Sequence, residues 1–162
     1  MQELPKPWFD LKSYKQIRLE EAKFEANLAQ KFLEEGLVRN AAGKAFQAWK
    51  ALIGAMLVDK REELIKKYPG RKKIKGGKAV EKADWLIAIV PTSYLEELSL
   101  LIGKDAAMIT AIALQVHDYQ YNGPDKEGVL SAFRSDEVAT EHIRILIEEI
   151  LRRADKSLAT QV

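Results

Sequence analysis

The sequence predicts an all-α protein built as a bundle of antiparallel helices. Three observations lead to this fold class. Apolar residues recur at spacings of three, four and seven over most of the chain, which is the period of one helix face. Serine and aspartate precede these stretches and glycine follows them, as helix caps do. Finally, no two segments stand out as paired strands.

The first two predicted helices form an antiparallel pair. Ser13 is the expected N-cap of the first helix, and Gly36 ends it. The second begins near Val38 and continues toward Tyr68. The connection between them is only about two or three residues long, which makes the helices antiparallel neighbours. Their apolar stripes comprise Ile17, Phe24, Leu28 and Phe32 in the first, and Ala41, Ala45, Trp49, Leu52 and Met56 in the second.

Two shorter helices are expected in the middle of the chain. Residues 79–90 are predicted to be helical, although the run 85–90 is apolar enough to be a buried strand. Helix is favoured because no partner strand is evident. Ser93 and Glu96 have the spacing of a capping box, which predicts a brief helix that ends at Gly103.

The last two predicted helices differ in their surfaces. Residues 106–116, after a cap at Asp105, leave almost no polar face. This pattern predicts a helix in the centre of the bundle or at a subunit interface, and therefore a homodimer. Ser135 is the expected N-cap of the final helix. Its apolar stripe comprises Ala139, Ile143, Leu146 and Ile150.

Length and composition predict a single domain. The chain has 162 residues, of which 47% are hydrophobic and 31% charged. We expect an N-terminal leader at 1–12, one helical domain at 13–156 and a frayed tail at 157–162. The absence of cysteine excludes disulfides and thiolate metal sites, and no metal or cofactor is predicted. No signal peptide or membrane span is visible, so we expect a cytoplasmic protein without membrane association.

Basic residues concentrate between positions 66 and 82, although the net charge of the chain is only +2. Pro69 and several glycines interrupt this stretch, which predicts a hairpin or connector. Lysines on such a loop neutralise backbone phosphates of a nucleic acid. The alternative is a solvated linker, since residues 70–82 include no aromatic side chain for base stacking. The candidate nucleic-acid-binding residues are Lys72, Lys73, Lys75 and Lys78.

Two segments support a resemblance to known families. The small-residue-rich stretch from Arg39 to Leu52 resembles the opening helices of HEPN-type bundles. The run His117-Asp-Tyr-Gln-Tyr-Asn-Gly-Pro-Asp125, with the helix start at 134–137, is similar to the archaeal PaREP1/PaREP8 family. The likeness extends from about residue 13 to 153. It implies a HEPN-like up-and-down bundle of four to five main helices with short extra helices, often a dimer.

The sequence departs from the motif of HEPN ribonucleases. In those enzymes an arginine precedes a histidine by four to six intervening residues. The positions before His117, residues 109–113, include no arginine, and Arg134 and His142 are separated by seven residues. What matches a related variant is a histidine followed two residues later by a tyrosine, here His117 and Tyr119.

The candidate site surrounds His117, the histidine that lies among other polar residues. Histidine moves protons near neutral pH, and a nearby cation stabilises a reacting phosphate. Tyr121, four residues on, lies on the same helix face as His117. Arg134 or Arg39 is the expected cation. The alternative is a helix-end histidine in a structural turn. The candidate catalytic residues are His117, Tyr121 and Arg134, and the candidate lining residues are Tyr119, Asn122 and Asp125.

Two functions follow from these residues. The first is a binding module for RNA or a nucleotide, one half of a toxin-antitoxin or defence pair, with a nucleotidyltransferase-type protein as its expected partner. The second is a metal-independent endoribonuclease that acts through His117. Geometry separates them, because an enzyme of this kind needs a cation within roughly 4 to 6 Å of the imidazole.

Overall fold

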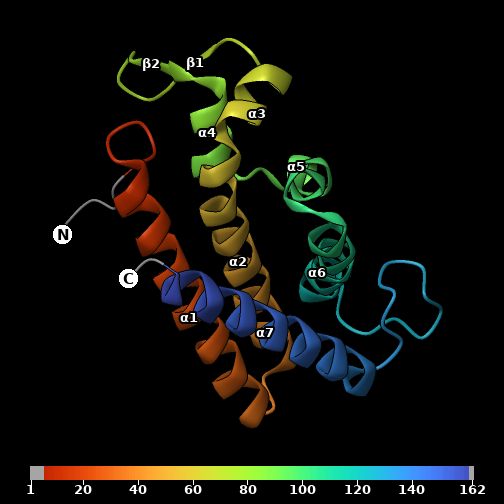
Figure 1. Ribbon diagram of the computed structural model, residues 1–162. Helices are drawn as coiled ribbons and strands as arrows, with labels where there is room; N and C mark the ends of the chain where they lie inside the picture. Colours follow the sequence, from red (N-terminus) through yellow and green to blue (C-terminus); the bar gives the residue numbers. More distant parts are fainter. Residues whose placement is uncertain (1–5, 161–162) are drawn as a thin grey trace.

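A computed structural model describes residues 6–160, and it has the all-α bundle that the sequence predicts (Figure 1). Four long helices account for most of it: α1 (Leu11–Glu34), α2 (Val38–Leu57), α6 (Lys104–Asn122) and α7 (Asp136–Ala159). Between α2 and α6 lie short elements, namely η1 (Val58–Lys60), α3 (Arg61–Lys67), β1 (Arg71–Lys73), β2 (Ala79–Glu81), α4 (Lys82–Ile89), η2 (Thr92–Tyr94) and α5 (Leu95–Ile102). Residues 1–5 of the expected leader and 161–162 of the expected tail lie outside the described range.

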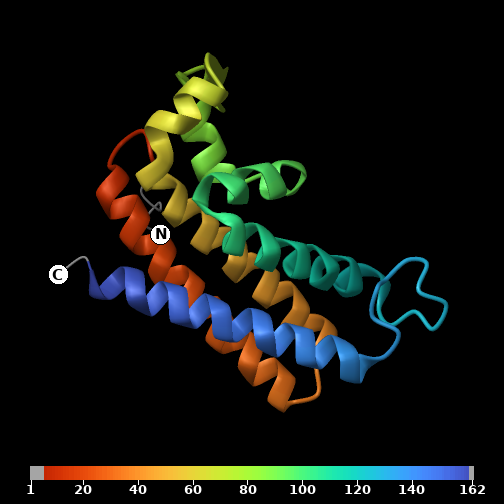
Figure 2. The same cartoon turned by 45° about the vertical axis from the view of Figure 1, so that its right-hand side comes forward.

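The four long helices run up and down. Lys44 of α2 pairs with Glu25 of α1 at 3.4 Å, as antiparallel neighbours require. Trp49 of α2 donates to the hydroxyl of Thr110 of α6 at 2.9 Å. The last turn of α6 then meets the first turn of α7, and α7 runs obliquely across α1 and α2 (Figure 2).

Helix α2 is the centre of the bundle because small side chains let other helices approach its backbone. It contacts α1, α6, α7, α4 and α5. Six of its twelve buried residues are alanines, and in the middle of α1 the buried residues are again small, Ala22, Ala26 and Ala29. The buried residues of α2 are Ala41, Ala42, Ala45, Phe46, Ala48, Trp49, Ala51, Leu52, Ile53, Gly54, Ala55 and Leu57.

The helix ends confirm one predicted cap and correct three. Ser135 accepts the N–H of Val138 at 3.2 Å, as expected. Helix α1 begins earlier than predicted, because the Asp10 carboxylate accepts both the N–H and the hydroxyl of Ser13. The capping box at Ser93 and Glu96 does not form, since η2 comes before α5 and no side chain caps that helix. Helix α6 starts at Lys104 after Gly103, so Asp105 lies inside its first turn and does not cap it.

The basic segment is a small antiparallel hairpin that projects from one end of the bundle (Figure 1). Residues 79–81, expected to begin a helix, instead form β2, with Lys72 opposite Val80. The apolar run after them is helical, as predicted. Within the described chain no single helix is long and apolar enough to cross a membrane. Only the segments Lys82–Ile89 and Thr92–Ile102, bent by 106°, reach that length and hydropathy when taken together.

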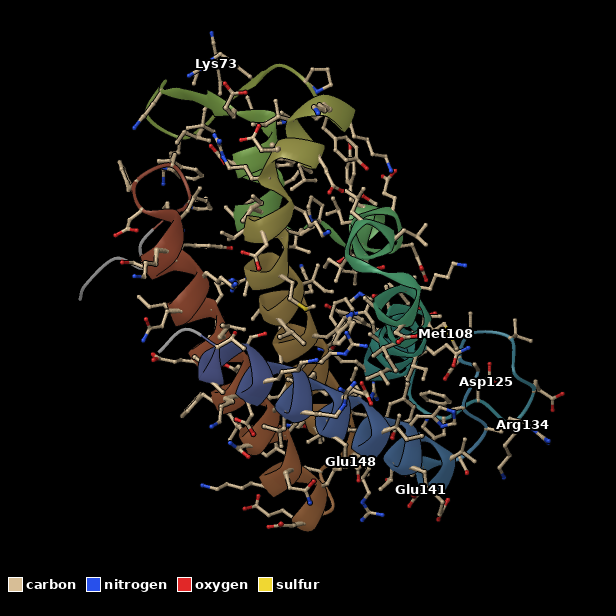
Figure 3. The ribbon with its side chains drawn as sticks, viewed as in Figure 1. Lys73, Met108, Asp125, Arg134, Glu141 and Glu148 are labelled. Carbon is tan, nitrogen blue, oxygen red and sulfur yellow. The ribbon has the colours of Figure 1, made fainter. Side chains whose placement is uncertain are left out.

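Helix α6 lies at the edge of the bundle, so the first of its two predicted positions, the centre of the bundle, is wrong. One face packs inward through Ala106, Thr110, Ala113, Val116 and Tyr119. The opposite face is open, and Met108 is 68% exposed (Figure 3). This helix has more apolar side chains than the neighbouring helices cover, so some of them are exposed to solvent. The helix also continues to Asn122, which places His117 within it.

Candidate functional site

One strip of α2 stays polar although the helix is otherwise buried. Gly43, Gln47 and Lys50 recur at spacings of four and three, so they share a face. An open groove of about 610 Å³ lies along the N-terminal part of this strip, between α1 and α6. Its lining is dominated by amide and cationic side chains. The lining residues are Phe32, Arg39, Asn40, Gly43, Lys44, Gln47 and Gln120.

His117 packs against α2 one helical turn before Gln120. Its imidazole stacks on the ring of Phe46, with centroids 4.1 Å apart and an interplanar angle of 23°. Tyr121 presents its ring edge-on to the same imidazole at 5.0 Å, which confirms the predicted pairing. The ring is half-buried, and its Nδ1 atom is buried without a hydrogen-bond partner.

The protonation of His117 follows from this packing. Burial lowers the pKa of the imidazole below 6.5, and the positive charge of Lys50 acts in the same direction. Asp118 and hydrogen bonding to the Gln120 side chain oppose this shift only in part. His117 is therefore neutral at pH 7.

Gly43 makes room for the Gln120 side chain. A Cβ atom at position 43 would lie 2.7 Å from Nε2 of Gln120, closer than non-bonded atoms approach. Glycine inside a helix costs about 1 kcal/mol relative to alanine. At this position the glycine permits a close approach that places the amide of Gln120 over the α2 backbone, inside the groove.

Lys50 continues the polar strip beyond the groove. Its Nζ lies 5.9 Å from the centroid of the Phe46 ring, the ring on which His117 stacks. Burial lowers the pKa of Lys50, and the charge of Arg18 on α1 lowers it further. Within residues 6–160 no carboxylate pairs with Lys50, and Nε of Arg18 is buried without a partner. The Arg18 guanidinium itself is paired, because its Nη1 atom donates to Glu21 at 2.6 Å.

The two arginines expected beside His117 have other partners. Arg39 donates to the carbonyls of Gln120 at 3.0 Å and Tyr121 at 2.7 Å, where it caps the end of α6. Arg134 donates to the carbonyl of Lys126 at 2.8 Å within the loop that follows α6. Figure 3 shows Arg134 on that loop, beyond the end of α6. The cation whose charge acts on the imidazole is Lys50, which sequence reasoning missed.

The candidate lining residues organise the end of α6 and its loop and do not line the groove. Tyr119 is fully buried, and its hydroxyl donates to Asp136 at 2.6 Å. Burial and that carboxylate raise the pKa of Tyr119 far above 10. Asn122 donates to two carbonyls, those of Asp118 and Leu130. The carboxylate of Asp125 accepts three backbone N–H groups of the loop, and these bonds lower its pKa.

All four candidate nucleic-acid-binding lysines are exposed on or beside the hairpin. The Nζ atom of Lys72 lies 4.5 Å from the centroid of the Trp85 ring. The Nζ atom of Lys78 lies 4.7 Å from the centroid of the Phe9 ring. Lys73 lies at the free end of the hairpin (Figure 3). Residues 70–82 include no aromatic side chain, but the fold brings two rings to the hairpin, Trp85 from α4 and Phe9 from the residues before α1.

The sequence contained one signal for the groove. A glycine inside a strongly helical pattern, followed at helical spacing by Gln47 and Lys50, marks a close approach with polar neighbours. Nothing in the sequence indicated that Arg18 or Gln120 would join them. That depends on which helices flank α2.

The fold and this polar strip define the protein as an all-α bundle with a groove between three long helices. The model of the archaeal PaREP1/PaREP8 family matches residues 17–144, which include α2, His117 and the start of α7. The chain belongs to this family. Comparisons with curated proteins and with solved structures gave no match.

Proposed function

We propose that this protein is a HEPN-like RNA-binding module that contacts RNA through the basic hairpin. The observation that supports it best is the combination at the hairpin of exposed lysines with two aromatic rings. Lysines bind the phosphate backbone, and aromatic faces stack on unpaired bases, so the expected ligand is single-stranded RNA. Phe9, which is 68% exposed, is the more accessible of the two rings.

Nearby acidic groups do not cancel the charge of the hairpin. Asp84 is buried and forms two hydrogen bonds with Arg61, at 2.7 and 3.1 Å. Glu81 pairs with Arg71 at 3.2 Å. Among the described residues these carboxylates are therefore neutralised by arginines, which leaves the charges of the four lysines available to a polyanion.

Charge reversal of the hairpin tests this proposal. We expect the triple variant Lys72→Glu, Lys73→Glu and Lys75→Glu to bind single-stranded RNA more weakly. Each lost phosphate contact lowers the slope of log affinity against log salt by about 0.7, so the slope should fall by up to about 2. Fluorescence anisotropy with a labelled oligoribonucleotide over a range of salt concentrations measures both quantities.

A matched variant controls for net charge. Lys104, Lys126 and Lys156 are exposed lysines outside the hairpin, and their replacement by glutamate changes the net charge by the same amount. This variant should keep most of the affinity. Equal losses in the two triple variants would show a non-specific charge effect, and an unchanged hairpin variant would make the segment a linker.

The alternative is a metal-independent endoribonuclease that acts through His117. The neutral, half-exposed imidazole near Lys50 favours it. Binding is preferred because neither Arg39 nor Arg134 is free to stabilise a reacting phosphate. Cleavage of an oligoribonucleotide by the wild type but not by His117→Gln would establish the enzyme. The nucleotidyltransferase-type partner remains a prediction from the resemblance, and we further propose a homodimer and a cytoplasmic location.

A further inference from the structure

We propose that a pocket beside the hairpin binds one unpaired guanine base of the RNA. This inference rests on the proposed function, because it names the base that the RNA-binding surface selects. The pocket has a volume of about 240 Å³ and lies between the hairpin and the residues that lead into α1, which are close to β2 in Figure 1. Its apolar side includes Pro7, Trp8 and Leu11, and its polar side includes Arg71, Lys78 and Glu81.

The apolar side of the pocket is fixed by the turn that precedes α1. The N–H groups of Phe9 and Asp10 both donate to the carbonyl of Lys6, at 3.0 and 3.2 Å. The side chain of Asp10 then caps the helix. Pro7 is buried, whereas Trp8 is partly exposed where it lines the pocket. Because aromatic rings stack on unpaired bases of every kind, Trp8 would contribute affinity without selecting the base.

The buried part of the polar lining is already satisfied. Asp84 lines the pocket, and its side chain is only 6% exposed. Both of its carboxylate oxygens accept N–H groups of Arg61, at 2.7 and 3.1 Å. The groups that could read a base are therefore those of the hairpin, Arg71 and Glu81.

Arg71 and Glu81 lie opposite each other in the register of the two strands. The guanidinium donates from Nη1 to Oε1 of Glu81 at 3.2 Å and from Nη2 to the carbonyl of Ala79 at 2.7 Å. These bonds orient the guanidinium and leave its other N–H groups for a ligand. Among residues 6–160, Oε2 of Glu81 accepts no hydrogen bond. The pocket thus offers N–H donors beside a carboxylate acceptor.

Guanine is the base that matches this pair of groups. Its O6 and N7 atoms accept two hydrogen bonds from one arginine, and its N1–H and N2–H groups can donate to a carboxylate. Adenine has an amino group in place of O6, so it would present a donor to the guanidinium. Uracil and cytosine lack N7. Lys78, which is exposed and pairs with no carboxylate among the described residues, suits the adjoining phosphate.

The base preference of RNA binding tests this pocket. We expect an oligouridylate with one central guanosine to bind about tenfold more tightly than the same oligomer with adenosine at that place, as measured by fluorescence anisotropy. Arg71→Lys keeps the charge but loses the two parallel donors, so it should bind both oligomers equally. Lys73→Gln is the matched control, because Lys73 is exposed on the same strand and does not line the pocket. It should weaken both oligomers and keep the tenfold ratio.

The outcomes separate this pocket from RNA binding itself. Equal binding of the two oligomers by the wild type, or a preference that survives in Arg71→Lys, would overturn the guanine pocket and leave the proposed function intact. If the wild type binds neither oligomer, the proposed function fails, and guanosine 5′-monophosphate tests the pocket alone. This nucleotide should then quench the tryptophan fluorescence of the wild type saturably, and that of Trp8→Phe less. Without saturable quenching the pocket proposal fails too.

Discussion

The state of His117 at neutral pH depends on the burial of its ring, which stacks on Phe46. In an unfolded chain the imidazole has a pKa of about 6.5. In the folded protein, burial lowers that pKa, so the unfolded state binds a proton more readily. The contribution of His117 to stability is therefore complete above about pH 6.5 and is lost as the pH falls from there through the folded-state pKa.

Because folding lowers the pKa of His117, acid should destabilise the folded protein through this residue. Between pH 7.5 and 5.5, the free energy of unfolding should fall more in the wild type than in His117→Gln, as measured by urea denaturation at each pH. Parallel curves for the wild type and His117→Gln would mean that burial does not perturb this imidazole.

At the scale of the element, two glycines of α2 have opposite roles. A Cβ atom at Gly54 would lie 3.1 Å from the carbonyl oxygen of Ile87 and 3.1 Å from the hydroxyl of Tyr14. That hydroxyl donates to the same carbonyl at 2.6 Å, which fixes α4 against α1 and α2. At Gly43 the nearest atom is instead the free end of the Gln120 side chain, which can rotate away.

We therefore expect Gly54→Ala to be destabilising and Gly43→Ala to be neutral or stabilising. Overpacking at Gly54 should cost about 1 to 3 kcal/mol, more than the roughly 1 kcal/mol gained in helix propensity. Gly43→Ala should gain up to about 1 kcal/mol, because only a flexible side chain has to move. Urea unfolding of both variants measures the difference. Equal effects would contradict the assignment of Gly54 to close helix packing and of Gly43 to the groove.

The elements also show how far the sequence predicts this structure. The long helices were predictable because their apolar period is strong, and Tyr121 was placed beside His117 by helix spacing alone. The hairpin strands, only three residues each, have no detectable alternation, and their pairing depends on the turn at Gly76 and Gly77. Asp10 and Ser13 are both residue types that cap helices well, and sequence alone did not show that Asp10 would be the N-cap of α1. Lys50 and Arg18 were missed because their proximity is set by packing between α1 and α2, which periodicity does not specify.

At the scale of the whole molecule, the apolar residues of α6 that the bundle leaves uncovered support the proposed dimer. Met108 lies beside α7, where it shares a shallow surface depression with Glu149 and Arg152. Ile145, one turn before Glu149, is exposed as well. Met108 and Ile145 are thus exposed apolar side chains of α6 and α7 that share this part of the surface with charged residues, away from the hairpin.

We therefore expect the wild type to have the mass of a dimer by light scattering at micromolar concentration. The double variant Met108→Asp, Ile145→Asp should have the mass of a monomer. Burial of a charge in an apolar interface opposes association, whereas both positions are exposed within one chain, so the helical circular dichroism should be unchanged. Leu130→Asp is the matched control, because Leu130 is 66% exposed but lies on the loop after α6. It should remain a dimer. A monomeric wild type would exclude the interface, and dissociation caused only by Leu130→Asp would move the interface from the α6–α7 face to the loop.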